Sequence, residues 1–242
     1  MTSNPDPGTL QIQVLRAYST LLQLRADWGG SFVLSLGLPP KGSALAIASN
    51  IAGAVSLSID DDETHLREVV RAGAVDFVVH SLDEAVRAMK NEVRKRTPLS
   101  VALSASPIAA LEEIASRGIA PQLFSSFIPS HPAILGAAEK LMAHGADLVD
   151  FDPESAASSL PEFRSSVSIL DRFLRERSWH LRTFSFQTLG ELREFEHRAL
   201  KTLPVEDTLR RRWLEVASRI LPREKPPSRV LWLSSAEEDL LS

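Results

Sequence analysis

The stretch 31–60 has the residue types and the order of a site that binds a nucleotide. An apolar run at 31–36 meets Gly37, and a short loop leads to Gly42 and a segment of small residues. A second apolar run ends at Asp60. In a dinucleotide site, loop glycines let backbone N–H groups approach a pyrophosphate, and the acid accepts hydrogen bonds from ribose hydroxyls. The order therefore predicts a strand, a phosphate-binding turn, a helix, a second strand and a ribose-binding carboxylate.

Two prolines reduce the number of phosphate donors that this loop can offer. Pro39 and Pro40 have no backbone N–H, whereas Lys41 could contact a phosphate as a point charge. The other interpretation is an inherited turn, an exposed lysine, and an acid that only begins the next helix. The residues that we expect to contact a cofactor are Gly37, Leu38, Lys41, Gly42, Ser43, Asp60, Ser104 and Ser106.

A second group of polar residues follows the predicted strands at the same edge of the sheet. Ligands bind at the carboxyl ends of strands in open α/β sheets, so histidines and serines there could act as acids, bases or oxygen ligands. These possible pocket residues are His80, Ser125, Ser126 and His131. Lone histidines are also common as structural residues, and no Gly-x-Ser-x-Gly motif activates a serine, so no catalytic residue is assigned. The acidic run 60–63 favours helix capping over a metal site, and no metal is predicted.

Alternating strand and helix patterns must position these residues. Strands are expected at 31–36, 54–59, 75–79, 99–103, 122–125 and 147–151, and helices at 9–26, 43–53, 62–72, 81–95, 106–117 and 133–144. Continuously apolar strands indicate a parallel sheet with helices on both faces. We predict an α/β fold, namely a Rossmann-like doubly wound parallel sheet of five or six strands, with the loop 37–43 at its carboxyl edge.

The character of the sequence changes after this sheet. We predict a dinucleotide-binding domain at 1–153 and a helical extension at 154–242 that packs on it or on a second subunit. Helices are expected at 160–178, 185–201 and 205–221. Their apolar stripes need a partner surface, for which a homodimer is the simplest closed arrangement. The arginine run 210–212 is interleaved with acids, which favours a solvated, salt-bridged face over a nucleic-acid patch.

Composition excludes several classes of protein. The chain has 242 residues, a formal net charge of −4 and no cysteine. The acidic balance argues against general nucleic-acid binding, and the lack of cysteine excludes disulfides, thiolate metal ligands and a cysteine nucleophile. The sequence has neither a secretory leader pattern nor an apolar run of about 20 residues, so we expect a cytoplasmic protein without a membrane segment.

Residues 8–131 resemble the NAD-binding domain of the urocanase (urocanate hydratase) family. Residues 37–46 are GLPPKGSALA where the family has GLGGMGGAQP, and Asp60 stands where the family has a ribose-binding glutamate. Arg71 keeps a family arginine, and His131 falls on the histidine of the family's TSAHD stretch. The resemblance implies a Rossmann-like fold and a site for NAD⁺, which that family uses as an electrophile rather than as a redox carrier.

The sequence also departs from the family at positions that would touch a ligand. Two loop glycines are prolines here, and the family's Cys-Gly-Asn at a strand end is Ser104-Ala105-Ser106. The family's Thr-Asp-Gln-Thr corresponds to residues 125–128, Ser-Ser-Phe-Ile. The flanking core domains that complete the family's substrate pocket have no counterpart in this sequence.

Three functional hypotheses follow from these observations. The first is a urocanase-like protein that binds NAD, another nucleotide or a small phosphorylated ligand without complete urocanate hydratase activity. The second is an interaction or scaffold protein whose pocket has decayed. The third is a hydratase or lyase with bound NAD, which would make the protein an enzyme; the sequence leaves that question open.

Overall fold

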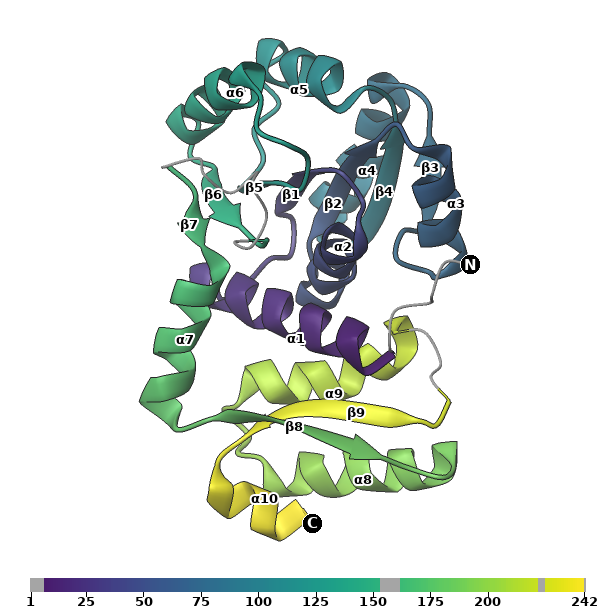
Figure 1. Ribbon diagram of the computed structural model, residues 1–242, viewed down its shortest axis with the longest axis vertical. Helices are drawn as coiled ribbons and strands as arrows, with labels where there is room; N and C mark the ends of the chain where they lie inside the picture. Colours follow the sequence, from purple (N-terminus) through teal and green to yellow (C-terminus); the bar gives the residue numbers. More distant parts are fainter. Residues whose placement is uncertain (1–6, 153–161, 222–224, 242) are drawn as a thin grey trace.

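The computed structural model describes residues 7–152, 162–221 and 225–241, and a parallel sheet forms its centre (Figure 1). Within these ranges seven strands pair in the order β3-β4-β2-β1-β5-β6-β7, and every pairing is parallel. The strands are β1 Phe32–Leu36, β2 Val55–Asp60, β3 Phe77–Val79, β4 Leu99–Ser104, β5 Leu123–Ser126, β6 Asp147–Asp150 and β7 Arg164–Ser165. The chain runs outward from β1 through β2 and later crosses back to β5, so the strand order reverses between β1 and β5.

Helices cover both faces of this sheet, as its apolar strands predict. The helices of the sheet are α1 Pro7–Leu24, α2 Pro40–Ala52, α3 Glu63–Arg71, α4 Leu82–Lys95, α5 Pro107–Ser116 and α6 Pro132–Ala143. Helices α1, α2 and α3 share a core with Val33 and Ala102 on one face. Helices α4, α5 and α6 share a second core with Leu34 and Leu57 on the opposite face. The Rossmann-like α/β prediction is confirmed.

Local sequence sets the ends of the helices that flank the predicted site. The Asp62 carboxylate accepts hydrogen bonds from the amides of Thr64 (2.7 Å) and His65 (3.3 Å) at the start of α3. These bonds lower the pKa of Asp62 below its usual value. Helix α2 ends at Gly53, whose φ of 97° lies in the left-handed region that glycine tolerates. The acidic run therefore caps a helix, as predicted.

The C-terminal part contains the predicted helices and also a small antiparallel sheet, which the sequence did not predict. Its elements are α7 Ser166–Arg177, β8 His180–Ser185, α8 Leu189–Thr202, α9 Thr208–Ile220, β9 Ser228–Leu233 and α10 Ser235–Leu241. Strands β8 and β9 form an antiparallel pair. Residues 164–165 form β7 instead of the start of a helix, so the sheet has seven strands rather than five or six. The predicted boundary at 153/154 lies outside the described residues.

Helix α1 lies between the sheet and the C-terminal layer (Figure 1). On the face of α1 that meets the C-terminal layer, the Trp232 indole donates to Ser19 Oγ (2.9 Å), and the Tyr18 ring stacks on Trp213 with centroids 6.0 Å apart. Gln11 donates to the carbonyl of Ser228 at 3.2 Å. The apolar stripes of the C-terminal helices therefore find their partner surface within the same chain.

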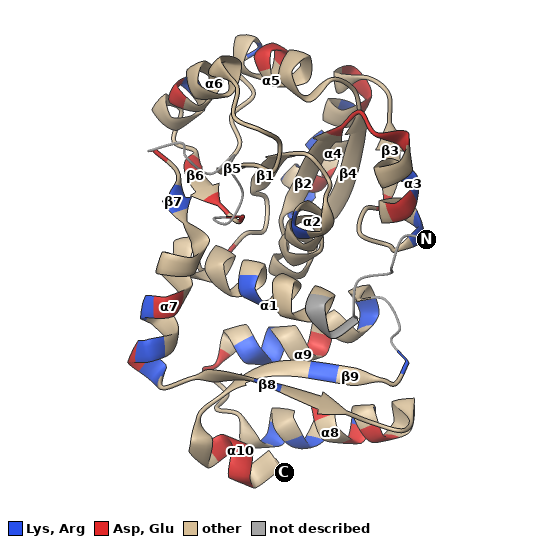
Figure 2. Ribbon diagram, in the orientation of Figure 1, with Lys and Arg blue, Asp and Glu red and all other residues tan. Residues whose placement is uncertain are grey.

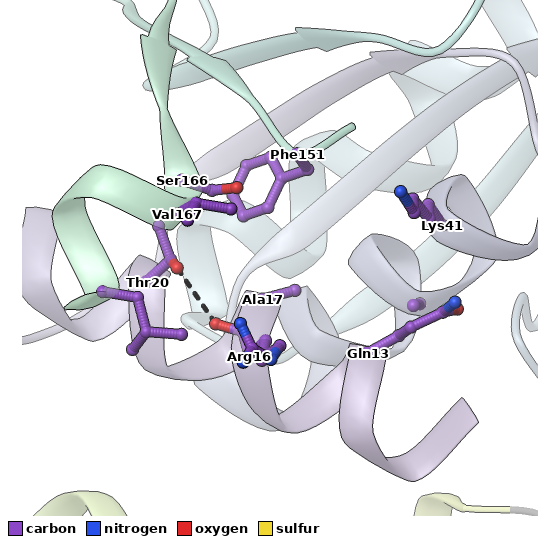
Figure 3. A pocket seen from close by; sticks show the side chains of 10 residues that line it. Gln13, Arg16, Ala17, Thr20, Lys41, Phe151, Ser166 and Val167 are labelled. Atoms are coloured by element: carbon purple, nitrogen blue, oxygen red, sulfur yellow. Dashed lines mark hydrogen bonds between the residues drawn. The ribbon is translucent and has the colours of Figure 1, made fainter. Parts of the chain in front are cut away.

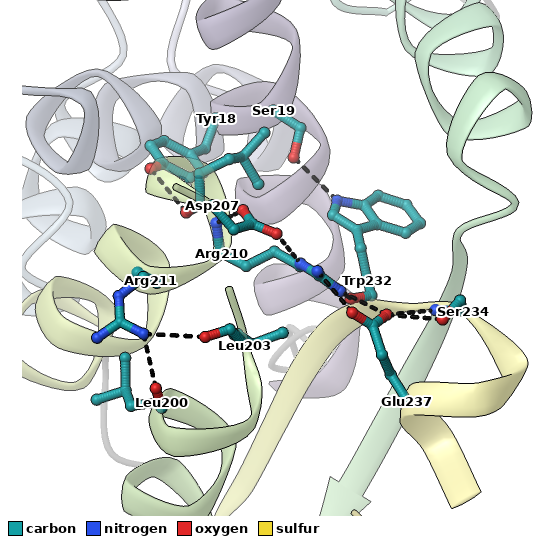
Figure 4. Close-up of polar contacts among 11 residues, drawn as sticks. Tyr18, Ser19, Leu200, Leu203, Asp207, Arg210, Arg211, Trp232, Ser234 and Glu237 are labelled. Atoms are coloured by element: carbon teal, nitrogen blue, oxygen red, sulfur yellow. Dashed lines mark hydrogen bonds and ion pairs between the residues drawn. The ribbon is translucent and has the colours of Figure 1, made fainter. Parts of the chain in front are cut away.

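The prediction of a solvated, salt-bridged face at 210–212 holds only in part, because Arg210 forms ion pairs but is buried, whereas Arg211 is half-buried and Arg212 is exposed. Arg210 is 2% exposed and pairs with Asp207 (2.5 Å) and Glu237 (2.8 Å), as Figure 4 shows. Arg211 donates to carbonyls of the α8 end, and Arg212 donates to a carbonyl in the last turn of α2. Elsewhere on α7, α8 and α9, basic and acidic residues are interspersed (Figure 2).

Candidate functional site

The loop between β1 and α2 is shaped by its two glycines. Gly37 has a φ of 83°, which a side chain would strain. A Cβ on Gly42 would lie 2.6 Å from the Gly37 carbonyl oxygen, so the backbone passes too close for any side chain. The Ser43 amide donates to Pro39 O (2.9 Å), and its hydroxyl donates to Leu38 O at 3.2 Å. Both glycines are therefore required by the turn itself, whether or not it holds an anion.

Asp60, the predicted ribose-binding acid, is turned toward the protein. It is 6% exposed, and its Oδ2 accepts the amide of Leu38 at 2.6 Å. Its Oδ1 accepts the amide of Asp62 at 2.8 Å, and His65 Nδ1 lies 3.4 Å from Oδ2. Each carboxylate oxygen of Asp60 thus accepts a hydrogen bond from a backbone amide of a neighbouring loop. The visible role of Asp60 is to fix the loop that follows β1.

Apolar side chains fill the switch point between β1 and β5. Leu38 is 2% exposed and Phe127 is 9% exposed. A Cβ added to Gly37 would meet Ile128 Cγ2 at 3.0 Å and Phe127 Cβ at 3.5 Å. Phe127 and Ile128 stand where the motif of the resembling family has a glutamine and a threonine. A pyrophosphate at the β1 turn would have to displace them.

The predicted pocket residues do not meet at one place. His80 follows β3 and is exposed, and its backbone amide donates to Glu84 at 3.0 Å. His131 caps α6, with Nδ1 accepting the amide of Ala133 at 3.2 Å. Strands β3 and β5 are four positions apart in the sheet, which corresponds to about 19 Å at roughly 4.8 Å per strand. The two histidines therefore belong to different surroundings.

The predicted serines also divide into separate environments. Ser104 is half-buried beside Asp60 in the strand register, while Ser106 is exposed and precedes α5 without a side-chain cap. Ser126 is 9% exposed, and its hydroxyl lies 3.5 Å from Ile128 O. Ser125 is fully buried. Among the described residues, its Oγ is the solvent-inaccessible side-chain atom that has no hydrogen-bond partner.

A cavity of about 360 Å³ opens beside the first turn of α2, on the α1 side of the sheet (Figure 3). Lys41 and Ala44 line it from α2, Phe151 lines it from the end of β6, and Ser166 lines it from the start of α7. Lys41 Nζ pairs with Asp152 Oδ1 at 2.6 Å. The cavity therefore lies at the carboxyl ends of parallel strands, where open α/β sheets bind ligands.

Sequence reasoning predicted Lys41 but missed the residues that face it from α1. Gln13, Arg16 and Thr20 line the cavity, and their spacing of three and four residues puts them on one side of a helix. This polar stripe on α1 was the available signal. Ser166 gave no such signal, because its position depends on β7, a strand of two residues.

The described residues contain neither a cluster of metal ligands nor a membrane-spanning helix. No group of three or more His, Cys, Asp or Glu side chains within residues 7–152, 162–221 and 225–241 could hold a metal ion. In the same ranges no helix has both the length and the apolar character needed to cross a membrane.

The parallel sheet, its switch point and the glycine turn after β1 define a Rossmann-like α/β protein of the kind that binds nucleotides. Residues 8–156 match the family model described as the urocanase Rossmann-like domain, and the chain therefore belongs to that family. The resemblance found in the sequence is thus confirmed.

Among solved structures, the chain is similar to a short chain alcohol dehydrogenase (rspB) from E. coli CFT073 complexed with the cofactor NADH. The two are 16% identical, with a TM-score of 0.37. The match covers 62% of this chain and 37% of that chain.

Proposed function

We propose that the protein binds a nucleotide or a small phosphorylated ligand and lacks complete urocanate hydratase activity. The observation that carries the proposal is the cavity beside the first turn of α2, with Lys41 and Arg16 as its charged lining residues. A volume of about 360 Å³ falls at the lower end of the range of ligand pockets, roughly 300–1,000 Å³. Membership of a family with an NAD site supports the same class of ligand.

The absence of hydratase turnover is proposed from the switch point. Leu38 and Phe127 are buried there, where a dinucleotide would cross the sheet. His80 and His131 lie too far apart to act on one substrate as acid and base. The purified chain should therefore not reduce urocanate absorbance above the uncatalysed rate, and measured turnover would refute this part of the proposal.

Titration with NAD⁺, NADH, ADP-ribose and AMP tests the binding proposal by thermal shift and calorimetry. We expect at least one of these ligands to stabilise the protein at millimolar concentration. Lys41→Gln should weaken that binding, whereas Lys90→Gln on the exposed surface of α4 is the matched control. A lack of stabilisation by every ligand would contradict the proposal.

A second candidate function is an interaction protein in which the dinucleotide site has been lost. The inward orientation of Asp60 and the burial of Phe127 favour it. It differs from the first proposal in one measurable respect, because it requires that no nucleotide or phosphate ester binds to the purified chain.

A further inference from the structure

The N-terminus of α7 faces the cavity without a side-chain cap. Helix α7 has 12 residues and starts at Ser166, directly after β7 ends at Ser165. The Ser165 side chain makes no capping hydrogen bond, and the first turn of α7 contains no acid. The first amides of a helix have no partner within the helix and carry partial positive charge. This end of α7 is thus suited to an anion.

The Ser166 side chain provides an independent indication of a ligand. It is 8% exposed and lines the cavity, and its hydroxyl makes no hydrogen bond to any described residue. Unlike the Ser125 hydroxyl, the Ser166 hydroxyl is accessible from the cavity, so it can donate a hydrogen bond to a molecule bound there. An oxygen atom of a ligand in the cavity would be a suitable acceptor.

The opposite wall of the cavity adds positive charge. Arg16 projects from α1, lies 5.9 Å from the Trp232 ring, and makes no ion pair with the described part of the chain. Lys41 reaches the cavity from α2 and pairs with Asp152. The cavity lining contains these two cations and, among described residues, no acid. Figure 3 shows Ser166 beside Phe151, and Arg16 and Lys41 on separate elements.

We propose that this cavity binds a phosphate monoester, with the phosphate between Ser166, the first turn of α7 and Arg16. The donors that line the cavity come from α1, α2 and α7. The three terminal oxygens of a phosphate can accept hydrogen bonds from several directions at once, whereas the two oxygens of a carboxylate lie in one plane. Phe151, Val167 and Leu170 supply an apolar wall for a compact, flat organic group. This inference rests on the proposed function and specifies its ligand class and contact residues.

Calorimetry with phenyl phosphate, benzoate and NAD⁺ tests the site in the full chain. Ser166→Glu places a carboxylate where the phosphate would lie, and Ser168→Glu makes the same change at an exposed position of α7. Arg16→Gln removes the cation, and Arg193→Gln is its control on the exposed side of α8. We expect phenyl phosphate to bind the parent and both controls, and to lose about tenfold or more in affinity with Ser166→Glu and with Arg16→Gln.

Different outcomes separate this inference from the proposed function. Equal phenyl phosphate affinity in the parent and in Ser166→Glu would overturn the site, and benzoate binding as tight as phenyl phosphate would overturn the ligand class. Binding of NAD⁺ alone, unchanged by both substitutions, would overturn the inference but leave nucleotide binding intact. A parent that binds none of the probes would overturn both.

Discussion

Replacing Asp60 should destabilise the fold more than it changes ligand binding. Its two oxygens accept the amides of Leu38 (2.6 Å) and Asp62 (2.8 Å). A hydrogen bond to a charged group contributes about 1.5–3 kcal/mol. Asp62 is exposed, so its amide can bond to water, whereas Leu38 is 2% exposed and its amide would lose its partner. We therefore expect Asp60→Ala to lower the free energy of unfolding by about 2–4 kcal/mol, mostly through Leu38.

Two further variants make this test specific. Asp60→Asn keeps one acceptor oxygen for the Leu38 amide but presents an NH₂ group to the Asp62 amide, so its cost should be about half as large. Asp61→Ala changes an exposed neighbouring acid and should stay within about 0.5 kcal/mol of the parent. Equilibrium unfolding in urea measures all three. An Asp60→Ala protein as stable as its parent that has lost nucleotide affinity would refute the reasoning and restore the ribose-binding role.

Three other predictions concern different parts of the structure. Burial raises the pKa of Glu237, but hydrogen bonds from Arg210 and Ser234 outweigh it and lower the pKa from 4.5 to about 2. The free energy of unfolding should therefore fall as the pH drops from about 4.5 toward 2. In Glu237→Gln, urea unfolding should show a weaker dependence of this free energy on pH in the same window. Ser125→Ala removes a buried hydroxyl without a described partner, so it should raise stability by about 1 kcal/mol, and a loss measured by the same method would indicate a bound water or ligand there. Deleting residues 160–242 should leave the α/β domain insoluble or markedly less stable, because it exposes Tyr18 and Ser19 on α1. Normal folding of the truncated form would contradict this prediction. Light scattering on the full chain tests the separate prediction of a homodimer.

The sequence predicted the central fold because that part is governed by local patterns. The strands from β1 to β6 each contain apolar residues and lie between helix signals, and the capping role of Asp62 follows from its position before α3. Strand β7 could not be predicted, since its two residues are a strand only through their pairing with β6. Strand β8 is partly exposed along its length, and its partner β9 lies more than 40 residues further along the chain.

The candidate site was predictable in its location but not in its contacts. The glycine turn and Lys41 are at the carboxyl edge, as expected from the pattern of residues 31–60. Whether Asp60 faces a ligand or the loop depends on the backbone path of Leu38, which no residue type reveals. The cavity residues on α1 and α7 come together only in the tertiary structure, so spacing within one segment could not indicate Ser166.

The central position of α1 has a consequence for the order of folding. This helix is synthesised well before its C-terminal partners: Gln11 bonds to Ser228 across 217 positions, and Trp232 bonds to Ser19 across 213. Contacts of such long sequence separation slow folding, because a long loop must close before they stabilise anything. During synthesis, the sheet can cover one side of α1 while the other side stays exposed until β9 leaves the ribosome. The nascent chain therefore presents an apolar helix surface to chaperones until β9 has been synthesised.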